Sequence, residues 1–383
     1  MSRQPMSDEK LIEAVELYDE LKNQAACAKQ LNISQPAFSL RLSKARARGY
    51  SPSHDMDHMV PEGYAVTGTS TLYDKKTGEP KIQWIKTSRQ KECEALQMQA
   101  IADVLKEDMP RVKPLPAPIK THTELCNEYI ITDYHYGMLA WKEENFDSNW
   151  DTKIAGDLLW KSFQRMVDDS PAAETAVIVN LGDFIHSDSM YAVTPSHGHI
   201  LDQDGRIAKI VREATNVFRK VIDYSLQKHN KVHVVMAEGN HDPYTSVWLR
   251  LMFDTLYENE PRLTVDTSNI PYYVHTHGDV MLAYHHGHKK QMATLPLFFA
   301  AQYPTVWGET KYRYAATGHR HHAETKEKEY SGMIIQQYQT LSSRDAYASH
   351  GGFLSERSVT SNCYHTKHGK VATHIFRPEM FDE

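Results

Sequence analysis

The stretch from Thr175 to His186, TAVIVNLGDFIH, is more informative about the fold than any other part of this chain. Its first half is a short apolar run rich in β-branched residues, which is typical of a buried strand. Its second half places Gly182, Asp183 and His186 directly after that strand. Polar side chains in this position lie at a sheet edge, where α/β proteins bind their ligands. We therefore expect a layered α/β (α+β) domain with a functional site at this edge.

Four other apolar runs end in the same way. The runs NEYIIT, KVHVVMA, DVMLAY and YRYAAT are followed, in this order, by Asp133-Tyr134-His135, Gly239-Asn240-His241-Asp242, His285-His286-Gly287-His288 and Gly318-His319-Arg320-His321. Helical patterns at 153–169, 205–229, 245–258 and 289–302 alternate with the strands, and GMIIQQYQTL and VATHIFR indicate further strands. Because strand ends meet at one edge of a sheet, the polar groups are expected to lie close together.

The side chains in these groups are suited to binding divalent metal ions. They offer oxygen and imidazole ligands, and the four cysteines lie far apart without a C-x-x-C motif, so a thiolate site is not expected. Such ligands suit manganese, which we expect here, and also iron, zinc, nickel or magnesium. Two ions about 3.5–4 Å apart can clamp a phosphate and activate a water. Asp183 is the candidate bridging ligand, and Asn240 adds a ligand without adding negative charge.

The ordered set DYH, GDFIH, GNHD, HHGH and GHRH resembles the calcineurin-like metallophosphoesterases over about residues 126–325. The resemblance implies a four-layer ββ sandwich flanked by helices, and it implies that His241 is the general acid for the leaving oxygen. It also implies two metal ions, the first held by Asp133, His135, Asp183 and His321, and the second by Asp183, Asn240, His286 and His319.

Two positions leave alternatives open. In HHGH, either His285 or His288 could replace His286 as the ligand, although strand alternation turns His285 to the other face. The GD-x-x-His spacing is similar to DNA-repair exonucleases of the SbcCD type, in which the added histidine helps to position the DNA end. For His186 this resemblance implies a catalytic role, and the alternative is a histidine that supports the ligands or lies in the core.

The N-terminal segment has a different pattern. Residues 7–48 predict three helices, and the third carries four basic residues without an acid: Arg41, Lys44, Arg46 and Arg48. We expect residues 1–50 to form a helix-turn-helix module that binds DNA, and the alternative is a small helical bundle whose charges are solvated. Residues 51–120 are expected to be a linker with a β-hairpin (TGTSTLYD and KIQWIKT), a helix at 88–107 and a proline-rich segment at 110–120. Residues 121–383 then form the enzyme domain.

Composition limits the remaining possibilities. Twenty of the 22 histidines lie at or after His122, which indicates that the chemistry lies in that part. A net charge of −6 argues against a generally basic nucleic-acid coat. No apolar run approaches the ~20 residues that span a bilayer, and the polar start is unlike a secretory signal. We therefore expect a cytoplasmic protein, and the host cytoplasm if the chain is encoded by a phage.

Together these patterns predict a hydrolase, a binuclear metal-dependent phosphodiesterase acting as a DNA nuclease. The helix-turn-helix followed by VPEGYAVTGTSTLYD resembles an arrangement in bacteriophage and prophage proteins, which implies a phage or prophage origin. The alternatives are a phosphatase or cyclic-nucleotide phosphodiesterase with a localisation module, and a non-catalytic DNA-binding accessory protein. The expected partner is DNA, with a second copy of the chain or a phage or host replication-recombination protein as further partners, and no membrane.

Overall fold

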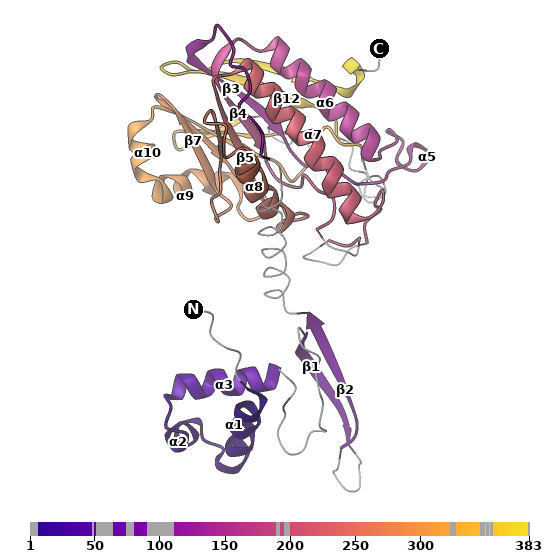
Figure 1. Cartoon of the computed structure of the whole chain (residues 1–383), viewed down its shortest axis with the longest axis vertical. Coiled ribbons are helices and arrows are strands. Elements are labelled where there is room, and N and C mark those ends of the chain that lie inside the picture. Colours follow the sequence, from indigo (N-terminus) through magenta and orange to yellow (C-terminus); the bar gives the residue numbers. More distant parts are fainter. Residues whose placement is uncertain are drawn as a thin grey trace. The chain divides into compact units, whose positions relative to one another are not determined.

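The computed structural model describes residues 7–47, 50, 64–73, 80–89, 111–188, 192–194, 200–321, 327–344, 349, 352 and 355–381. The chain divides into two compact units, Met1–Ala100 and Ile101–Glu383 (Figure 1). The helix expected at 88–107 lies outside the described residues, except that residues 88 and 89 belong to a strand. Among the helices that the structure describes, none has the length and apolar character needed to cross a membrane.

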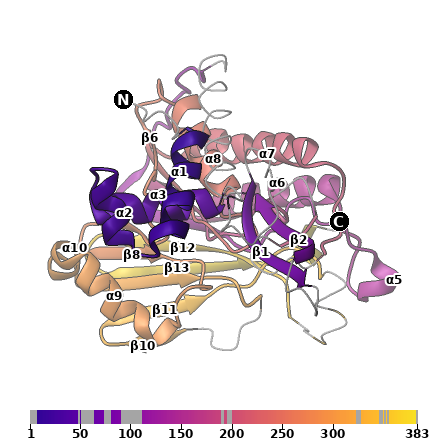
Figure 2. The same cartoon turned by 90° about the horizontal axis from the view of Figure 1, so that it is seen from below.

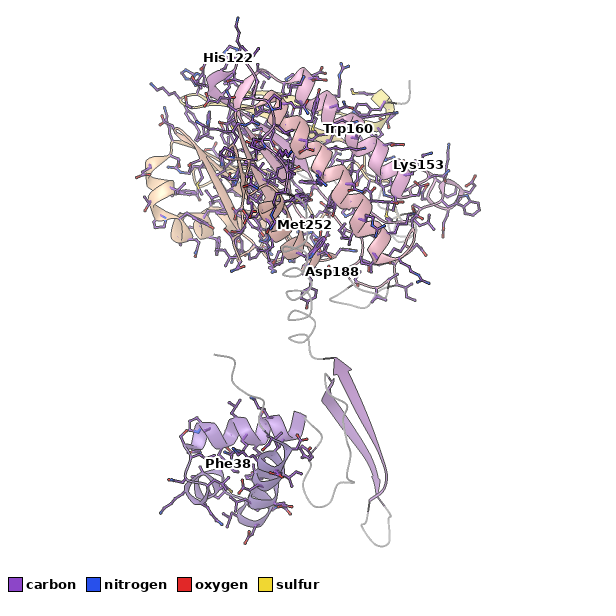
Figure 3. The ribbon with its side chains drawn as sticks, in the orientation of Figure 1. Phe38, His122, Lys153, Trp160, Asp188 and Met252 are labelled. Atoms are coloured by element: carbon purple, nitrogen blue, oxygen red, sulfur yellow. The ribbon has the colours of Figure 1, made fainter. Side chains whose placement is uncertain are left out.

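The N-terminal unit contains the three expected helices, α1 (Asp8–Leu21), α2 (Gln24–Gln30) and α3 (Gln35–Ala47). The Asn23 side chain caps α2 by accepting hydrogen bonds from the backbone N–H groups of Ala25 and Ala26. The helices pack around Phe38, which is fully buried (Figure 3). Strands β1 (Tyr64–Tyr73) and β2 (Pro80–Arg89) form the predicted antiparallel hairpin. DNA binding by this unit stays a prediction.

The larger unit contains two mixed sheets. The six-stranded sheet has the order β13-β12-β3-β4-β5-β6, with β3 (His122–Ile131), β4 (Ala173–Asn180), β5 (Lys231–Met236), β6 (Leu263–Val265), β12 (Val359–His365) and β13 (Gly369–Phe376). The five-stranded sheet has the order β10-β11-β9-β8-β7, with β7 (Tyr273–His277), β8 (Val280–Tyr284), β9 (Tyr312–Thr317), β10 (Lys328–Tyr330) and β11 (Met333–Gln337). Strands β3, β4, β5 and β6 run parallel, as do β8, β9 and β11.

Alternating strand residues place the two sheets face to face between two layers of helices. On β4, Ile178 packs toward α6 (Thr152–Asp169), α7 (Ile207–Lys228) and α8 (Thr245–Leu256), whereas Val177 packs toward the second sheet. On β8, Leu282 belongs to the core between the sheets, and Met281 packs against α9 (Leu295–Gln302) and α10 (Pro304–Glu309). Figure 2 shows α6 and α7 side by side on the same face. The expected layered α/β domain is therefore present, with four layers.

Several elements differ from the prediction. Strands β6 and β7 lie between the third and fourth predicted strands, so the five strands that carry the polar groups are not consecutive. The helix predicted at 289–302 begins only at Leu295, after a short 3-10 turn, Met292–Thr294. Two further short helices, α5 (Lys142–Asn145) and a 3-10 turn at Pro378–Phe381, complete the unit.

The proline-rich segment has no regular secondary structure at residues 111–120, and it lies against the larger unit. The backbone N–H of Val112 donates to the carbonyl of Leu256 at 2.8 Å. The backbone N–H of Leu115 donates to the Glu260 carboxylate at 2.8 Å, and Arg262 donates to the Leu115 carbonyl at 2.7 Å. These bonds fix the path of the chain into β3.

Candidate metal centre

The polar groups that follow β3, β4, β5, β8 and β9 meet at one edge of the two sheets. Two groups of side chains each bring three ligand atoms to within 4.8 Å of one another. The first group is Asp133, His135 and His321, and the second is Asp183, His286 and His319. The two groups contain six of the seven residues that the resemblance implies as ligands, divided as it implies, while a bridging role for Asp183 stays a prediction.

Five of these six residues have a left-handed backbone, with φ of 48° at Asp133, 48° at His135, 53° at Asp183, 74° at His319 and 56° at His321. A residue with a Cβ pays about 1–2 kcal/mol for this conformation, and it persists only where the surroundings impose it. Such strain gathers at functional sites. Its concentration on the candidate ligands therefore marks this edge as the functional part of the unit.

Hydrogen bonds to the backbone hold the strained residues in place. The hydroxyls of Thr340 and Ser342 donate to the Asp133 carbonyl at 2.6 and 3.0 Å. The N–H of Asp133 donates to the Gly182 carbonyl at 3.0 Å, and the N–H of His135 donates to the Asp183 carbonyl at 2.9 Å. The loops after β3 and β4 thus fix each other, and both carboxylates are oriented before any ion binds.

Asp242 fastens the loop after β4 to the loop after β5. Its buried carboxylate accepts from four backbone N–H groups, which belong to Asp183, Phe184, Ile185 and Gly239, at 2.7–3.2 Å. Burial, together with the charge of Asp183, raises the pKa of Asp242 to about 6. Asp242 is the last residue of GNHD, and the motif alone does not indicate this role, because the partners are backbone N–H groups.

Asp188, labelled in Figure 3, makes the reciprocal connection. It accepts from the backbone N–H groups of Tyr244 and Thr245 at 2.6 and 2.7 Å, at the start of α8, and from the Thr245 hydroxyl. Burial raises the pKa of Asp188 to about 7, and its hydrogen bonds oppose that rise. The loop after β5 therefore binds the backbone of the loop after β4 through Asp242, and the loop after β4 binds the start of α8 through Asp188. His241 lies on the loop after β5.

Two motif glycines leave room for the carboxylates. A Cβ on Gly239 would lie 2.0 Å from Asp183 Oδ1, and a Cβ on Gly318 would lie 2.5 Å from Asp133 Oδ2. No side chain fits at these distances. The glycine of GNHD is thus explained by the closeness of Asp183, and the glycine of GHRH by the closeness of Asp133 and of the Thr132 hydroxyl.

His286 indicates where a cation belongs. Its Nδ1 lies 2.9 Å from the Leu181 carbonyl, which can only accept, so Nδ1 carries the hydrogen of the neutral ring. The Nε2 lone pair then faces Asp183 Oδ2 at 3.1 Å and Asn240 Oδ1 at 3.2 Å. Three lone pairs converge only around a proton or a metal ion. The backbone carbonyl on Nδ1 is also the partner that ligand histidines use to orient Nε2.

The distances among the ligand atoms fit a shared ion. Two ligands on one ion at ~2.0–2.1 Å lie roughly 2.9–3.4 Å apart, from octahedral to tetrahedral geometry. His135 Nε2 lies 3.3 Å from His321 Nε2, and His321 Nε2 lies 3.4 Å from Asp133 Oδ1. These values fall in that range, as do those around His286, so the residues fit two divalent ions.

The electrostatics agree with this arrangement. Burial alone would lower the pKa of His286, but Asp183 and Asp133 raise it to about 9. Burial would raise the pKa of both aspartates, but the nearby histidines, His286 above all, hold them well below their usual range. The pocket is therefore negative enough to hold a proton on His286 when no metal ion is bound, and a divalent ion would compete for the same place.

The structure separates the three histidines of HHGH. His286 belongs to the second ligand group, whereas His285 stacks on Tyr272 with the ring centroids 4.6 Å apart. Nδ1 of His285 accepts from the Gly287 backbone at 2.9 Å. His288 is half-buried beside His286, with the ring centroids 5.2 Å apart, and it belongs to neither ligand group.

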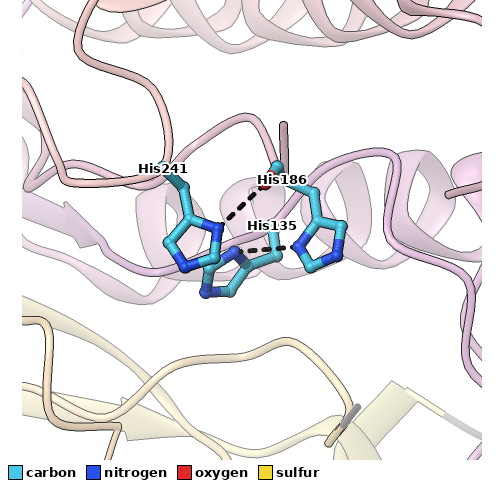
Figure 4. A group of neighbouring side chains, drawn as sticks. All are labelled: His135, His186 and His241. Carbon is cyan, nitrogen blue, oxygen red and sulfur yellow. Dashed lines mark hydrogen bonds between the residues drawn. The ribbon is translucent and has the colours of Figure 1, made fainter. Parts of the chain in front are cut away.

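His186 and His241 both lie next to the ring of His135 (Figure 4). His186 is buried, and its Nδ1 lies 3.2 Å from His135 Nδ1. His241 is half-buried, its backbone N–H donates to Asp183 Oδ1 at 2.7 Å, and its Nδ1 donates to the His186 carbonyl at 2.9 Å. The contact with His135 matches the alternative in which His186 supports a ligand, and its catalytic role stays a prediction.

The basic residues of α3 differ in placement. Arg41 lies 3.7 Å from Glu13 of α1, and its side chain is 15% exposed, so it faces into the helical unit. Lys44 is exposed. The side chains of Arg46 and Arg48 lie outside the described residues.

Comparisons with known proteins add little to this geometry. No family model and no curated protein matches the chain. Among solved structures, a conserved uncharacterized protein from Streptococcus pneumoniae, titled a predicted phosphoesterase, is 11% identical with a TM-score of 0.28, over 67% of this chain and 99% of its own. The sulfate thiohydrolase SoxB of Thermus thermophilus, in complex with glycerol, is 9% identical with a TM-score of 0.31, over 67% of this chain and 57% of its own. Scores this low establish neither a common fold nor a common activity.

Proposed function

We propose that this chain is a metal-dependent phosphoesterase with two divalent ions at the edge formed by β3, β4, β5, β8 and β9. One observation carries the proposal: two carboxylate–imidazole groups lie side by side and are joined through His286. Nε2 of His286 lies 3.1 Å from Asp183 and 4.0 Å from Asp133. Two ions held this closely suit the clamping and hydrolysis of a phosphate ester.

The first ion would be held by Asp133, His135 and His321, and the second by His286, His319 and the Asn240 amide, with Asp183 as a ligand of both. When bound, the ions supply Lewis acidity and a water of lowered pKa as the nucleophile. The remaining step belongs to His241. Its Nδ1–H is engaged by the His186 carbonyl, so Nε2 is the nitrogen that can carry a second proton and donate it to the leaving oxygen.

The reaction we propose is phosphodiester hydrolysis in DNA, with manganese as the metal. The charge count supports an anionic phosphate ester as substrate: two divalent ions with two carboxylates and one hydroxide would carry a formal charge of +1. The separate helical unit with the exposed Lys44 supports a nucleic-acid substrate. The phage or prophage origin and the cytoplasmic location stay predictions.

A substrate panel in manganese tests the proposal. It includes bis-p-nitrophenyl phosphate, p-nitrophenyl phosphate, single- and double-stranded DNA, RNA and cyclic nucleotides. We expect turnover of the nitrophenyl diester and of DNA, and loss of both when the metal is chelated. Preference for the nitrophenyl monoester would favour a phosphatase, and no turnover of any substrate would refute an esterase.

A second experiment tests the DNA part alone. If Lys44 neutralises one DNA phosphate, Lys44→Ala lowers the slope of log affinity against log salt by roughly 0.9. Lys10→Ala on α1, also an exposed lysine, is the matched control and should leave the slope unchanged. Equal slopes for all three proteins would remove Lys44 from the DNA interface without affecting the esterase proposal.

A further inference from the structure

A third group of metal-ligating side chains lies beside the two ligand groups. His135, His186 and His241 each bring one ring nitrogen to within 4.8 Å of the others, and no carboxylate takes part (Figure 4). The three rings come from the loops after β3, β4 and β5. His186 and His241 belong to neither of the other two groups. We call these three residues the histidine cluster.

The hydrogen bonds within the cluster leave unprotonated ring nitrogens that face one another. Because the carbonyl of His186 can only accept, Nδ1 of His241 carries the hydrogen and its Nε2 is unprotonated in the neutral ring. Nδ1 of His135 faces Nδ1 of His186 at 3.2 Å, a distance that a single shared hydrogen must bridge. Replacing that hydrogen with a cation would satisfy both nitrogens at once.

The spacing of the His135 and His186 nitrogens suits a tetrahedral ion. Two nitrogen ligands at ~2.0–2.1 Å from a tetrahedral ion lie roughly 3.3–3.4 Å apart, close to the spacing of the two Nδ1 atoms. Three imidazoles with one open position form a typical zinc coordination set. Manganese prefers oxygen ligands, and the cluster supplies none from its side chains.

We propose that the histidine cluster is a separate zinc-binding site, formed by Nδ1 of His135, Nδ1 of His186 and Nε2 of His241. A neutral imidazole has one lone pair, so His135 serves either this ion through Nδ1 or the first ion of the metal centre through Nε2. The two ions therefore exclude each other at His135.

The consequence for activity rests on the proposed function. A zinc ion in the cluster takes His135 from the first ion and occupies the nitrogen through which His241 would donate its proton. Zinc bound there blocks the metal centre, and removal of that zinc restores it. The site thus makes hydrolysis sensitive to the zinc supply.

Zinc binding itself tests the proposal without any measurement of turnover. The full-length protein is loaded with manganese and titrated with zinc against a chromophoric chelator, and crystals are soaked in zinc for anomalous diffraction at the zinc edge. We expect an anomalous peak between the three imidazoles of the wild type. In His186→Gln this peak should vanish and the corresponding zinc affinity should fall more than about 100-fold, because the loss of an outer-shell partner alone costs about 10–100-fold.

His288→Gln is the matched control, since His288 is a half-buried histidine beside the metal centre but outside the cluster. It should keep the cluster peak and the zinc affinity of the wild type. Zinc density confined to the two carboxylate-containing groups, or equal zinc binding by wild type and His186→Gln, would overturn the proposal. A zinc-free, manganese-loaded protein that hydrolyses none of the substrates, but still binds zinc in the cluster when zinc is added, would refute the proposed function and leave this site intact.

Discussion

Buried histidines at the two ends of the same strands differ in how their ring nitrogens are used. His229 directly follows α7 and lies beside the start of β4, and both of its nitrogens are paired, Nδ1 with the Ala173 carbonyl at 2.7 Å and Nε2 with the Tyr129 hydroxyl at 3.0 Å. At the opposite end, His286 has Nδ1 paired with a carbonyl, and its Nε2 faces the oxygen acceptors of Asp183 and Asn240. Burial is nearly complete in both cases, at 1% exposed each.

The pKa values show the same contrast. Burial lowers the pKa of His229 to about 4, whereas Asp183 and Asp133 overcome burial and raise the pKa of His286 to about 9. His229 is a neutral, satisfied part of the structure, and His286 is incomplete without a cation. The number of histidines therefore says less about function than the partners of each ring do.

The largest effect is expected at Asp183. Asp183→Ala removes an acceptor of His286 and the only proposed bridging ligand, so the variant should lose bound metal and fall to background hydrolysis. The backbone of the loop is held by Asp242 rather than by the Asp183 side chain, so the protein should still fold. Metal analysis of the purified protein at saturating manganese checks this. A wild type that never exceeds one equivalent would contradict the two-metal mechanism.

His241→Gln should separate binding from catalysis. Because His241 lies outside the two carboxylate-containing groups, the variant should keep its manganese. Loss of a general acid costs typically 10²–10⁴-fold, so DNA hydrolysis should fall by that order. The loss should be smaller for nitrophenyl diesters, whose leaving group hardly needs a proton. Equal losses on both substrates would count against the acid role.

At the structural end, His229→Ala should act on stability alone. It leaves the Ala173 carbonyl buried without its partner and removes the His229 partner of the Tyr129 hydroxyl. Each buried unsatisfied group costs about 1–3 kcal/mol, so we expect a loss of roughly 2–4 kcal/mol in urea unfolding. Metal content should not change. His368→Ala, an exposed histidine, is the control and should stay within about 0.5 kcal/mol of the wild type. A change in bound manganese in His229→Ala would contradict the purely structural role that we assign to His229.

The sequence located the site because apolar strands and ligand motifs are local signals. Strand β9 was predicted at its observed bounds, and the predicted ends of β3, β4, β5 and β8 were close enough to place every motif at the correct edge. Strand β12 was missed because it buries polar residues. Its Asn362 donates to Glu128 at 2.8 Å, a pairing between residues far apart in the sequence, and the polar stretch alone is typical of a loop.

The hydrogen bonds that hold the loops of the site could not be predicted from the sequence either. Thr340 and Ser342 lie more than 200 residues from Asp133, whose carbonyl they bind, and no motif connects them. Asp188 follows GDFIH by only two positions, but its partners are backbone N–H groups near residue 244, which carry no side-chain signal. The types of the candidate ligands could be predicted from the sequence, whereas the hydrogen bonds that hold the backbone of these residues are visible only in the structure.

The smallest expected effect concerns Asp188. Its measurement shows whether burial or the hydrogen bonds from the start of α8 determine the charge of this carboxylate at neutral pH. Burial raises its pKa to about 7 in the folded state, against a usual value near 4 in the unfolded chain. Between these values the folded state binds more protons, so the free energy of unfolding falls as the pH rises from about 4 to about 7 and is then constant. In Asp188→Asn the contribution of Asp188 to this decline should be absent, and the variant should gain stability relative to the wild type over that range. Urea unfolding from pH 4 to 8 measures the difference. A difference that does not change with pH would show that the N–H groups of Tyr244 and Thr245 keep the carboxylate ionised, and that the connection between the two loops is charged wherever the site is active.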